Sequence, residues 1–230
     1  MFLSRVLRGG ALGAGLLLAA MPALAIEEGD VIVRVGATSV QPHESSSLVS
    51  TTATGPLAGT AARVGNDIQL GLNLVYMYSD NIGLEVLAAT PFEHDLEVSG
   101  LGRYGFTTTH LGSTRHLPPT LSALYYFGSS SDAVRPYAGL GVNYTIFFNE
   151  SLGNHARTEL AADRLQLDDS WGLSARAGID WDLNNQWILN ASFWRIDIDT
   201  TATLNSALGK VRADVDIDPW VYMVSVGYKF

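Results

Sequence analysis

Apolar residues alternate with small or polar ones over most of the chain, and this period of two constrains the fold more than any other feature. In the segment 68–78 the even positions are apolar or aromatic, whereas the other face includes Gln69 and Asn73. Successive side chains of a β-strand point to opposite faces, so this segment is predicted to be a strand with one apolar face. The segments 136–148 and 171–183 repeat the pattern. The chain is therefore predicted to be all-β.

Soluble β-sandwiches also alternate, so the contents of the second face decide which solvent surrounds the strands. That face is rich in glycine and carries four charged residues that suit a dry core poorly, namely Arg34, Glu85, Arg176 and Asp180. The polar interior of a transmembrane barrel accommodates such residues, while its apolar face contacts lipid. We therefore expect an antiparallel transmembrane β-barrel with these four residues in its lumen.

The alternation defines eight strands, an even number. They are Val31–Gln41, Asp67–Tyr78, Ile82–Leu96, Leu111–Phe127, Val134–Asn149, Ser170–Leu183, Trp187–Thr203 and Val211–Phe230. Short turns and longer connections follow one another alternately along the chain, which is the order of periplasmic turns and external loops in bacterial barrels. Both ends of the barrel domain are then periplasmic.

The first 25 residues have the pattern of a secretory signal peptide. Arg5 and Arg8 precede an apolar run over 11–21, and Ala23-Leu24-Ala25 provides small residues for cleavage. We expect a cleaved signal at 1–25 and a single outer-membrane barrel domain at 26–230.

Composition excludes several other functions. The chain has no cysteine, so disulfides, thiol catalysis and thiolate metal sites are absent. Loss of Arg5 and Arg8 with the signal lowers the formal net charge from −9 to −11, which makes nucleic acid a poor partner. The five histidines are scattered without ligand spacing, so neither a metal site nor another cofactor is predicted.

Several short motifs resemble those of the OmpW family, which includes the AlkL-type alkane uptake proteins. They are His116-Leu117-Pro118-Pro119-Thr120, Arg135-Pro136-Tyr137, Asn143-Tyr144-Thr145, Asp169-Ser170-Trp171-Gly172 and the closing segment from Asp218-Pro219-Trp220 to Phe230. The resemblance spans the mature chain, and the external loops match least. It implies an eight-stranded barrel in a Gram-negative outer membrane. A narrow, partly apolar lumen would admit small hydrophobic solutes to the membrane through an opening in the wall.

The last strand ends in alternating aromatic residues that include Tyr228 and Phe230. By resemblance to other outer-membrane proteins, these two are expected to be the signal that the barrel assembly machinery recognises. The upper part of the same strand has its apolar residues on the opposite parity, so we predict a phase slip near Asp218-Pro219.

Two large apolar residues stand on otherwise small or polar inward faces. Leu87 shares its face with Glu85, and Trp194 shares its face with Asn190 and Ser192. An eight-stranded barrel is only just wide enough for side chains to fill it. Leu87 and Trp194 are therefore predicted to form an apolar constriction, with ordinary plugging of a small barrel as the alternative.

Three prolines fall in the upper halves of the third and fourth strands. Pro91, Pro118 and Pro119 each remove a donor from the ladder. Unpaired backbone is costly in lipid, so these positions should lie above the hydrocarbon or face a cavity. A lateral opening is one use of the break, and simple strand termination at the headgroup level is the other.

Two further features bear on the external end and on catalysis. Residues 156–167 indicate a short amphipathic helix in the third external loop, with a solvated turn as the alternative. His94, His116 and Ser122 do not form a recognisable nucleophilic setting, so no enzyme activity is predicted and these histidines are expected at the polar rim.

The sequence leaves two functions open. One is a passive channel for small hydrophobic solutes that works among outer-membrane lipids. The other is a structural or adhesive barrel. An apolar path beside Leu87 and Trp194 favours the first, and a closed, ion-paired lumen favours the second.

Overall fold

The structure is a computed structural model that describes residues 26–107, 109–206 and 209–230. The predicted signal peptide lies outside these residues. None of the helices in the described ranges has the length and hydropathy that a membrane-spanning helix needs.

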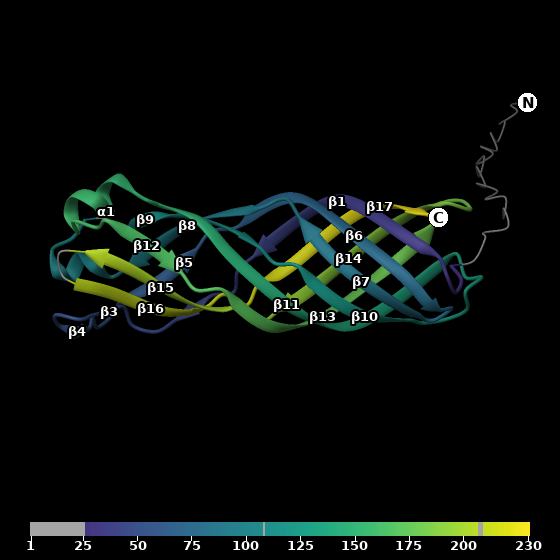
Figure 1. The fold of residues 1–230 in the computed structure, drawn as a ribbon, viewed down its shortest axis with the longest axis horizontal. Helices are drawn as coiled ribbons and strands as arrows, with labels where there is room; N and C mark the ends of the chain where they lie inside the picture. The colour runs from purple at the N-terminus through teal and green to yellow at the C-terminus, as the bar shows by residue number, and fades with distance from the viewer. Residues whose placement is uncertain (1–25, 108, 207–208) are drawn as a thin grey trace, which may run out of the picture.

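Within the described residues, eight antiparallel strands close into a barrel (Figure 1). In sequence order they are β1 (Val31–Gln41), β6 (Asp67–Ser79), β7 (Ile82–Ala89), β10 (Thr120–Tyr126), β11 (Val134–Leu152), β13 (Ser170–Asp182), β14 (Trp187–Ile196) and β17 (Trp220–Lys229). Around the ring the order is β10, β7, β6, β1, β17, β14, β13 and β11. Pairing of β11 with β10 completes the circle, so the predicted fold class is confirmed.

Side chains on the barrel strands alternate between a buried and an exposed face, as the sequence predicts. The exposed face is apolar; on β11, for example, Leu140 is 72 % exposed whereas Asn143 is fully buried. At the barrel end near the C-terminus, the ring of Tyr228 packs edge-on against Trp187 and Phe230. This face is the surface that lipid covers, and the aromatic cluster lies where its periplasmic rim is expected.

Four of the predicted strands are each interrupted, and prolines mark three of these breaks in the sequence. The third and fourth strands break at Thr90-Pro91 and at Pro118-Pro119. The seventh breaks at Asp197-Ile198, and the eighth breaks over 217–219, where Asp218 has a φ of +40°. The strand breaks at the predicted Asp218-Pro219, but the predicted phase slip was wrong, because odd-numbered side chains are buried both above the break (Val215, Ile217) and below it (Val221, Met223). The upper pieces leave the barrel and enter separate sheets.

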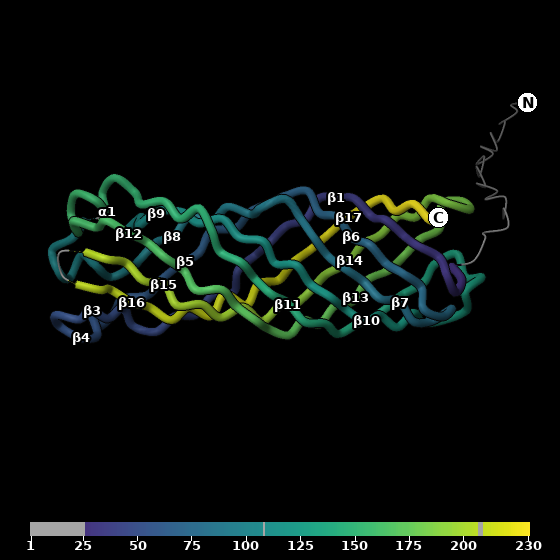
Figure 2. The backbone as a smooth tube through the Cα atoms, viewed as in Figure 1, coloured from purple at the N-terminus to yellow at the C-terminus, as the bar shows by residue number. Residues whose placement is uncertain are grey.

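The predicted long external connections contain strands of their own, and with the upper strand pieces they form two external sheets (Figures 1 and 2). One sheet joins the upper part of β11 to β9 (His110–Leu117), β8 (Phe92–Ser99) and β5 (Ala61–Val64). The other contains β12 (Arg164–Leu167), β15 (Asp199–Ser206), β16 (Gly209–Asp216), β3 (Ser50–Thr51) and β4 (Gly55–Pro56), with β2 (Ser45–Ser46) beside β16.

The described helical structure also lies at this external end. The helix α1 (Asn154–Glu159) follows β11, and the 3-10 helix η1 (Leu101–Tyr104) follows β8. The helix predicted over 156–167 is thus correct only in its first part, because residues 164–167 pair with β15 as strand β12.

The alternation can be tested on β11, since the natural chain has no cysteine. A cysteine at Leu140 should react with a membrane-soluble maleimide, and one at Asn143 should not, because the latter side chain points into the lumen. A one-residue slip would exchange the two faces. Labelling of both variants in native outer membranes, followed by mass spectrometry, measures this directly, and the reverse pattern would contradict the register.

Candidate binding chamber and lumen

The four charged residues predicted to face the lumen do meet there. Arg34 of β1 lies 2.5 Å from an Asp180 carboxylate oxygen on β13 and 3.7 Å from Glu85 on β7. Arg176 of β13 forms an ion pair with Glu85, and all four side chains are almost fully buried. Buried charges are tolerated when they are paired and hydrogen-bonded. The network therefore joins three separate walls of the barrel.

Neutral side chains extend this network across the barrel. The Arg34 guanidinium donates to the Tyr126 hydroxyl at 2.8 Å, and Arg176 donates to the Tyr137 hydroxyl at 2.6 Å. The Asn190 amide donates to Asp180 at 2.7 Å. Because eight strands enclose space for little more than side chains, this level of the lumen is closed by direct contacts.

Leu87 and Trp194 lie above the polar network and come from opposite walls, since β7 and β14 are four places apart in the ring. Both are buried in the same apolar cluster. The guanidinium of Arg176 lies 4.1 Å from the centre of the Trp194 ring, within the range of a cation–π contact. Ile196 and Ile198 continue the inward face of Trp194. These residues separate a polar lumen from an apolar space.

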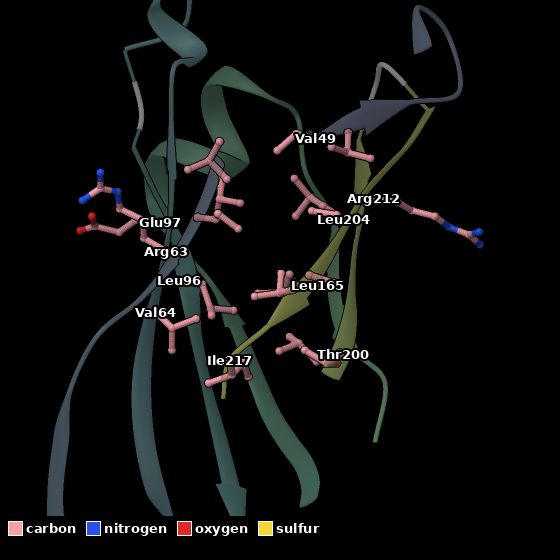
Figure 3. Close-up of a pocket in the computed structure, with 18 residues that line it drawn as sticks. Val49, Arg63, Val64, Leu96, Glu97, Leu165, Thr200, Leu204, Arg212 and Ile217 are labelled. Carbon is pink, nitrogen blue, oxygen red and sulfur yellow. The ribbon is translucent and has the colours of Figure 1, made fainter. Parts of the chain in front are cut away.

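That apolar space is a chamber between the two external sheets (Figure 3). It contains a cavity of about 50 Å³, lined by Val49, Ala62, Val64, Leu96, Val98, Leu111, Leu165, Leu167, Ala202, Leu204, Val211, Ala213, Val215 and Ile217 together with Thr200. In Figure 3 the charged ends of Arg63, Glu97 and Arg212 point away from it. The interior of the chamber is thus almost wholly apolar.

Two smaller cavities adjoin the chamber. The lower one shares Val64, Leu96 and Ile217 with it, and the outer one shares Val98 and Leu204. Apolar walls therefore extend from the outer end of the molecule down toward Trp194. Sequence reasoning missed this chamber. Its signal was the shifted parity of the apolar residues at 211–217, which turns them toward the space between the sheets.

His94 and His116 are not at the polar rim, so that prediction was wrong. Both are buried on neighbouring strands β8 and β9, and their rings stack with centres 4.8 Å apart. Burial lowers the pKa of both histidines, and for His116, with the help of nearby His94, to about 3. Ser122 lies instead beside Glu85 in the barrel. The structure therefore does not assemble the three residues into a catalytic group.

The predicted lateral opening coincides with a gap in the strand ladder. Leu87 pairs with Thr120 below the gap, and Phe92 pairs with His116 above it. Between these pairs, in the described chain, no ladder pair joins residues 88–91 to residues 117–119. Pro91, Pro118 and Pro119 all fall in this gap.

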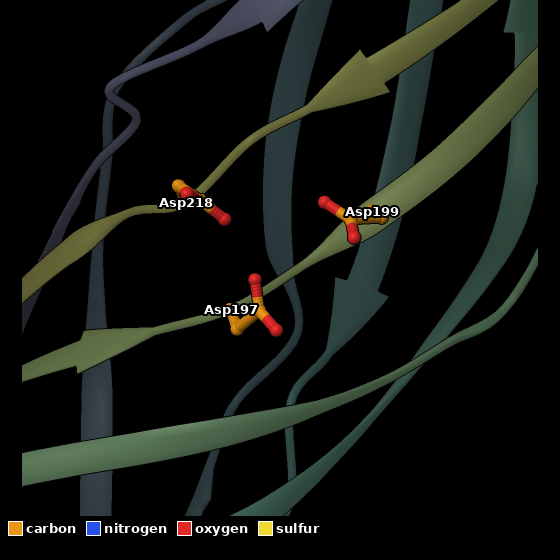
Figure 4. Close-up of side chains that lie close together, drawn as sticks. All are labelled: Asp197, Asp199 and Asp218. Carbon is orange, nitrogen blue, oxygen red and sulfur yellow. The ribbon is translucent and has the colours of Figure 1, made fainter.

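A cluster of carboxylates lies where the seventh and eighth strands break (Figure 4). The oxygens of Asp197, Asp199 and Asp218 that could hold an ion are within 4.8 Å of one another. Arg195 lies 3.1 Å from Asp218 and neutralises part of this charge. Desolvation, together with the neighbouring carboxylates, raises the pKa of Asp199. The cluster is exposed to solvent and separate from the chamber.

Comparison with known proteins identifies the family to which this architecture belongs. The family model of the OmpW family matches residues 27–230. The chain belongs to the OmpW family. Outer membrane protein W of Vibrio cholerae serotype O1 is 47 % identical over 215 residues, which cover 93 % of this chain and 94 % of that protein. This OmpW-family chain is accordingly an outer-membrane protein of the Gram-negative type.

Solved and more distant relatives agree. The crystal structure of OprG from Pseudomonas aeruginosa superposes with a TM-score of 0.84 at 42 % identity, and the match covers 90 % of this chain and 99 % of OprG. Outer membrane protein AlkL of Ectopseudomonas oleovorans is 26 % identical over 180 residues, which cover 76 % of this chain and 72 % of AlkL. The resemblance to the OmpW family, and to its AlkL-type members, is confirmed.

The predicted assembly signal lies on the outside of the periplasmic rim. Phe230 is 72 % exposed, and its backbone amide donates to the Val31 carbonyl across the β1–β17 seam. Tyr228 accepts a hydrogen bond from the Gln186 side chain at 2.5 Å. Little in the folded barrel covers the Phe230 ring, and its role as an assembly signal stays a prediction.

Deletion of Phe230 should therefore lower the amount of folded barrel in the outer membrane while export across the inner membrane continues. Heat-modifiable mobility on gels measures the folded fraction, and a Phe230→Trp variant, which keeps the aromatic end, serves as the control. Equal folded fractions for the deletion and the control would contradict an assembly role.

The buried histidines should make the external sheets less stable in acid. In the unfolded chain His116 protonates near the ordinary histidine pKa of 6.5, whereas in the folded chain its pKa of about 3 keeps it neutral. Folding stability is thus present above pH 6.5 and is lost as the pH falls, by about 2 kcal/mol at pH 5 for this residue. Amide hydrogen exchange of β8 and β9 between pH 7 and pH 5 measures the loss. The dependence should shrink in His116→Phe, and an unchanged dependence would refute this assignment.

Proposed function

We propose that the protein is a passive channel that takes small hydrophobic molecules from the exterior and releases them sideways into the outer membrane. The main observation that supports this proposal is the apolar chamber, which lies at the external end of a barrel whose lumen is filled by ion-paired side chains. Apolar solutes gain free energy when they leave water for such a space, at about 25 cal/mol per Å² of buried surface. The chamber therefore favours the entry of hydrophobic solutes without an energy source.

A solute in the chamber has an unfavourable route downward. Leu87 and Trp194 form the predicted constriction, and the charged network of Arg34 and Asp180 lies below them. An apolar molecule that passed this level would separate paired buried charges, which is strongly destabilising. Transport straight through the barrel is therefore disfavoured, and the route through the wall is the alternative.

The ladder gap offers that route. Each missing hydrogen bond makes separation of two strands easier, and Pro91, Pro118 and Pro119 have no amide hydrogen to restore it. Leu87 at the end of β7 and Phe92 at the start of β8 border the gap on one side and belong to the same apolar cluster as the chamber lining. A solute would thus reach the gap along apolar side chains and enter lipid without crossing water.

Two considerations favour transport over a structural or adhesive role. A structural barrel accounts for the ion-paired lumen, but it gives no reason to keep an apolar cavity between the external sheets. The relation to AlkL also supports uptake, since the resemblance to AlkL-type proteins implies hydrophobic solutes.

Closing the gap tests the proposal. A variant with Pro91→Ala, Pro118→Ala and Pro119→Ala restores three amide hydrogens; the one at residue 119 faces β11, because the Pro119 carbonyl accepts from Tyr144, so the donors at residues 91 and 118 are the ones available to the gap. If each new hydrogen bond contributes about 1 kcal/mol to the closed wall, uptake should fall by about fivefold for each bond formed. The initial rate of n-octane uptake by cells with equal amounts of folded protein measures the effect.

Pro136→Ala is the matched control, because Pro136 lies in barrel strand β11, away from the gap, and its carbonyl already accepts a hydrogen bond from Phe127. This variant should transport octane as the natural protein does. An unchanged rate in the triple variant would exclude the lateral route, and equal rates in cells with and without the natural protein would exclude the channel itself.

A further inference from the structure

The lower end of the apolar chamber contains a stack of four rings, two of which are imidazoles. His116 stacks on His94 at 4.8 Å and on Phe92 at 5.5 Å, and the ring of Phe147 lies 5.7 Å away on its own strand β11. His94, His116 and Thr114 line the lower cavity, whose remaining lining is apolar. Packing alone does not require histidine in such a stack, because phenylalanine would fill the space without a desolvated polar group.

The hydrogen bonds of the two imidazoles are incomplete. His94 Nδ1 donates to the Gly65 carbonyl at 2.5 Å, which leaves a lone pair on Nε2 of the neutral ring. His116 is 5 % exposed, and its Nδ1 atom has no hydrogen-bond partner. Buried polar atoms are normally paired, so an unpaired one beside a cavity indicates a place for a missing partner.

The two histidines also lie at the upper edge of the ladder gap. Phe92 and His116 form the first ladder pair above the gap, and His94 is two residues further along the same face. A molecule that moves from the chamber to the gap passes these rings before it enters lipid. A polar group on that molecule would be held there while its apolar body remained among Leu96, Phe147 and their neighbours.

We propose that His94 and His116 form a hydrogen-bonding subsite of the chamber, which selects apolar molecules that carry one hydroxyl group over hydrocarbons of the same length. The inference rests on the proposed function and names its preferred substrates, which are small alcohols and phenols. A hydroxyl matches the site because it both donates and accepts, as a neutral imidazole does. A carboxylate does not match, because a buried charge would need a counter-ion that the cavity lining does not supply.

Binding can be tested without transport. In lipid nanodiscs, the protein labelled with ¹⁵N-histidine is titrated with 1-hexanol and, separately, with n-hexane, and the His116 signal is assigned from its loss in His116→Gln. Hexanol should shift the His116 Nδ1 resonance, and hexane should not. Equal shifts with both probes, or no shift with either, would overturn the subsite.

Selectivity is tested by uptake of 1-octanol and n-octane into cells that contain equal amounts of folded protein. His116→Phe keeps the stacked ring and removes the polar atoms, so octanol uptake should fall by about threefold to tenfold, the value of one hydrogen bond, while octane uptake holds. Phe92→Leu is the matched control, because it disturbs the same stack without removing a polar group and should change both rates alike.

The two experiments separate the subsite from the channel. A hexanol-specific shift with no protein-dependent uptake of either solute would keep the subsite and refute the channel. Protein-dependent uptake of both solutes, with the octanol-to-octane ratio unchanged in His116→Phe, would keep the channel and refute the subsite.

Discussion

The structure depends on the requirement that every backbone amide and carbonyl inside a bilayer be paired within the protein, because lipid offers no partner. The ring from β10 to β11 meets this requirement by closing on itself. Four of the described strands are interrupted at 90–91, 118–119, 197–198 and 217–219, and each of these interruptions lies where a strand passes from the barrel to an external sheet. The breaks thus mark the height at which the barrel wall ends and the external sheets begin.

Polarity reverses at this height on both faces of the wall; the fourth, seventh and eighth walls keep their inward parity through the break, and the third wall shifts by one residue at Thr90-Pro91. On the third wall Glu85 faces a polar lumen, and further along the same wall Leu96 and Val98 face the apolar chamber. The outward face changes in the opposite sense, from Val86 to the exposed ion pair of Glu93 with Arg115. The external half therefore follows the rule for two sheets in water, with an apolar core and a charged surface. The membrane half follows the rule for a barrel in lipid.

The barrel strands could be predicted from sequence because alternation is a local pattern, and every second residue of a barrel strand must be apolar where it contacts lipid. The first strand, Val31–Gln41, has the predicted ends, and the four charged lumen residues face inward as expected. The external sheets could not be predicted in this way. Strands such as β2 and β3 have two residues each, too few for a period to be visible, and they exist because β16 provides pairing partners.

The candidate site was harder to predict for a related reason. His94 and His116 are polar by residue type, and their burial comes from Phe92, Phe147 and the facing sheet rather than from their own segment. The chamber needs two sheets built from distant parts of the chain, so local sequence indicated it only through the shifted parity of 211–217. Leu87 and Trp194 were placed correctly on the inward face because their strands alternate without interruption through those positions.

Trp194 joins the two halves in a way that few other residues can. A residue that lies between a charged network and an apolar chamber must make favourable contacts with both. The π-face of the indole attracts the Arg176 guanidinium at 4.1 Å, while the rest of the ring belongs to the apolar cluster of the chamber. Leucine at this position would pack well in the apolar chamber, but it would give the Arg176 guanidinium no favourable electrostatic contact. Arginine or glutamine could hydrogen-bond to the polar network, but either would bring a polar group into the apolar chamber. The face of the indole, which is apolar and yet attracts a cation, therefore suits tryptophan to this boundary inside the protein.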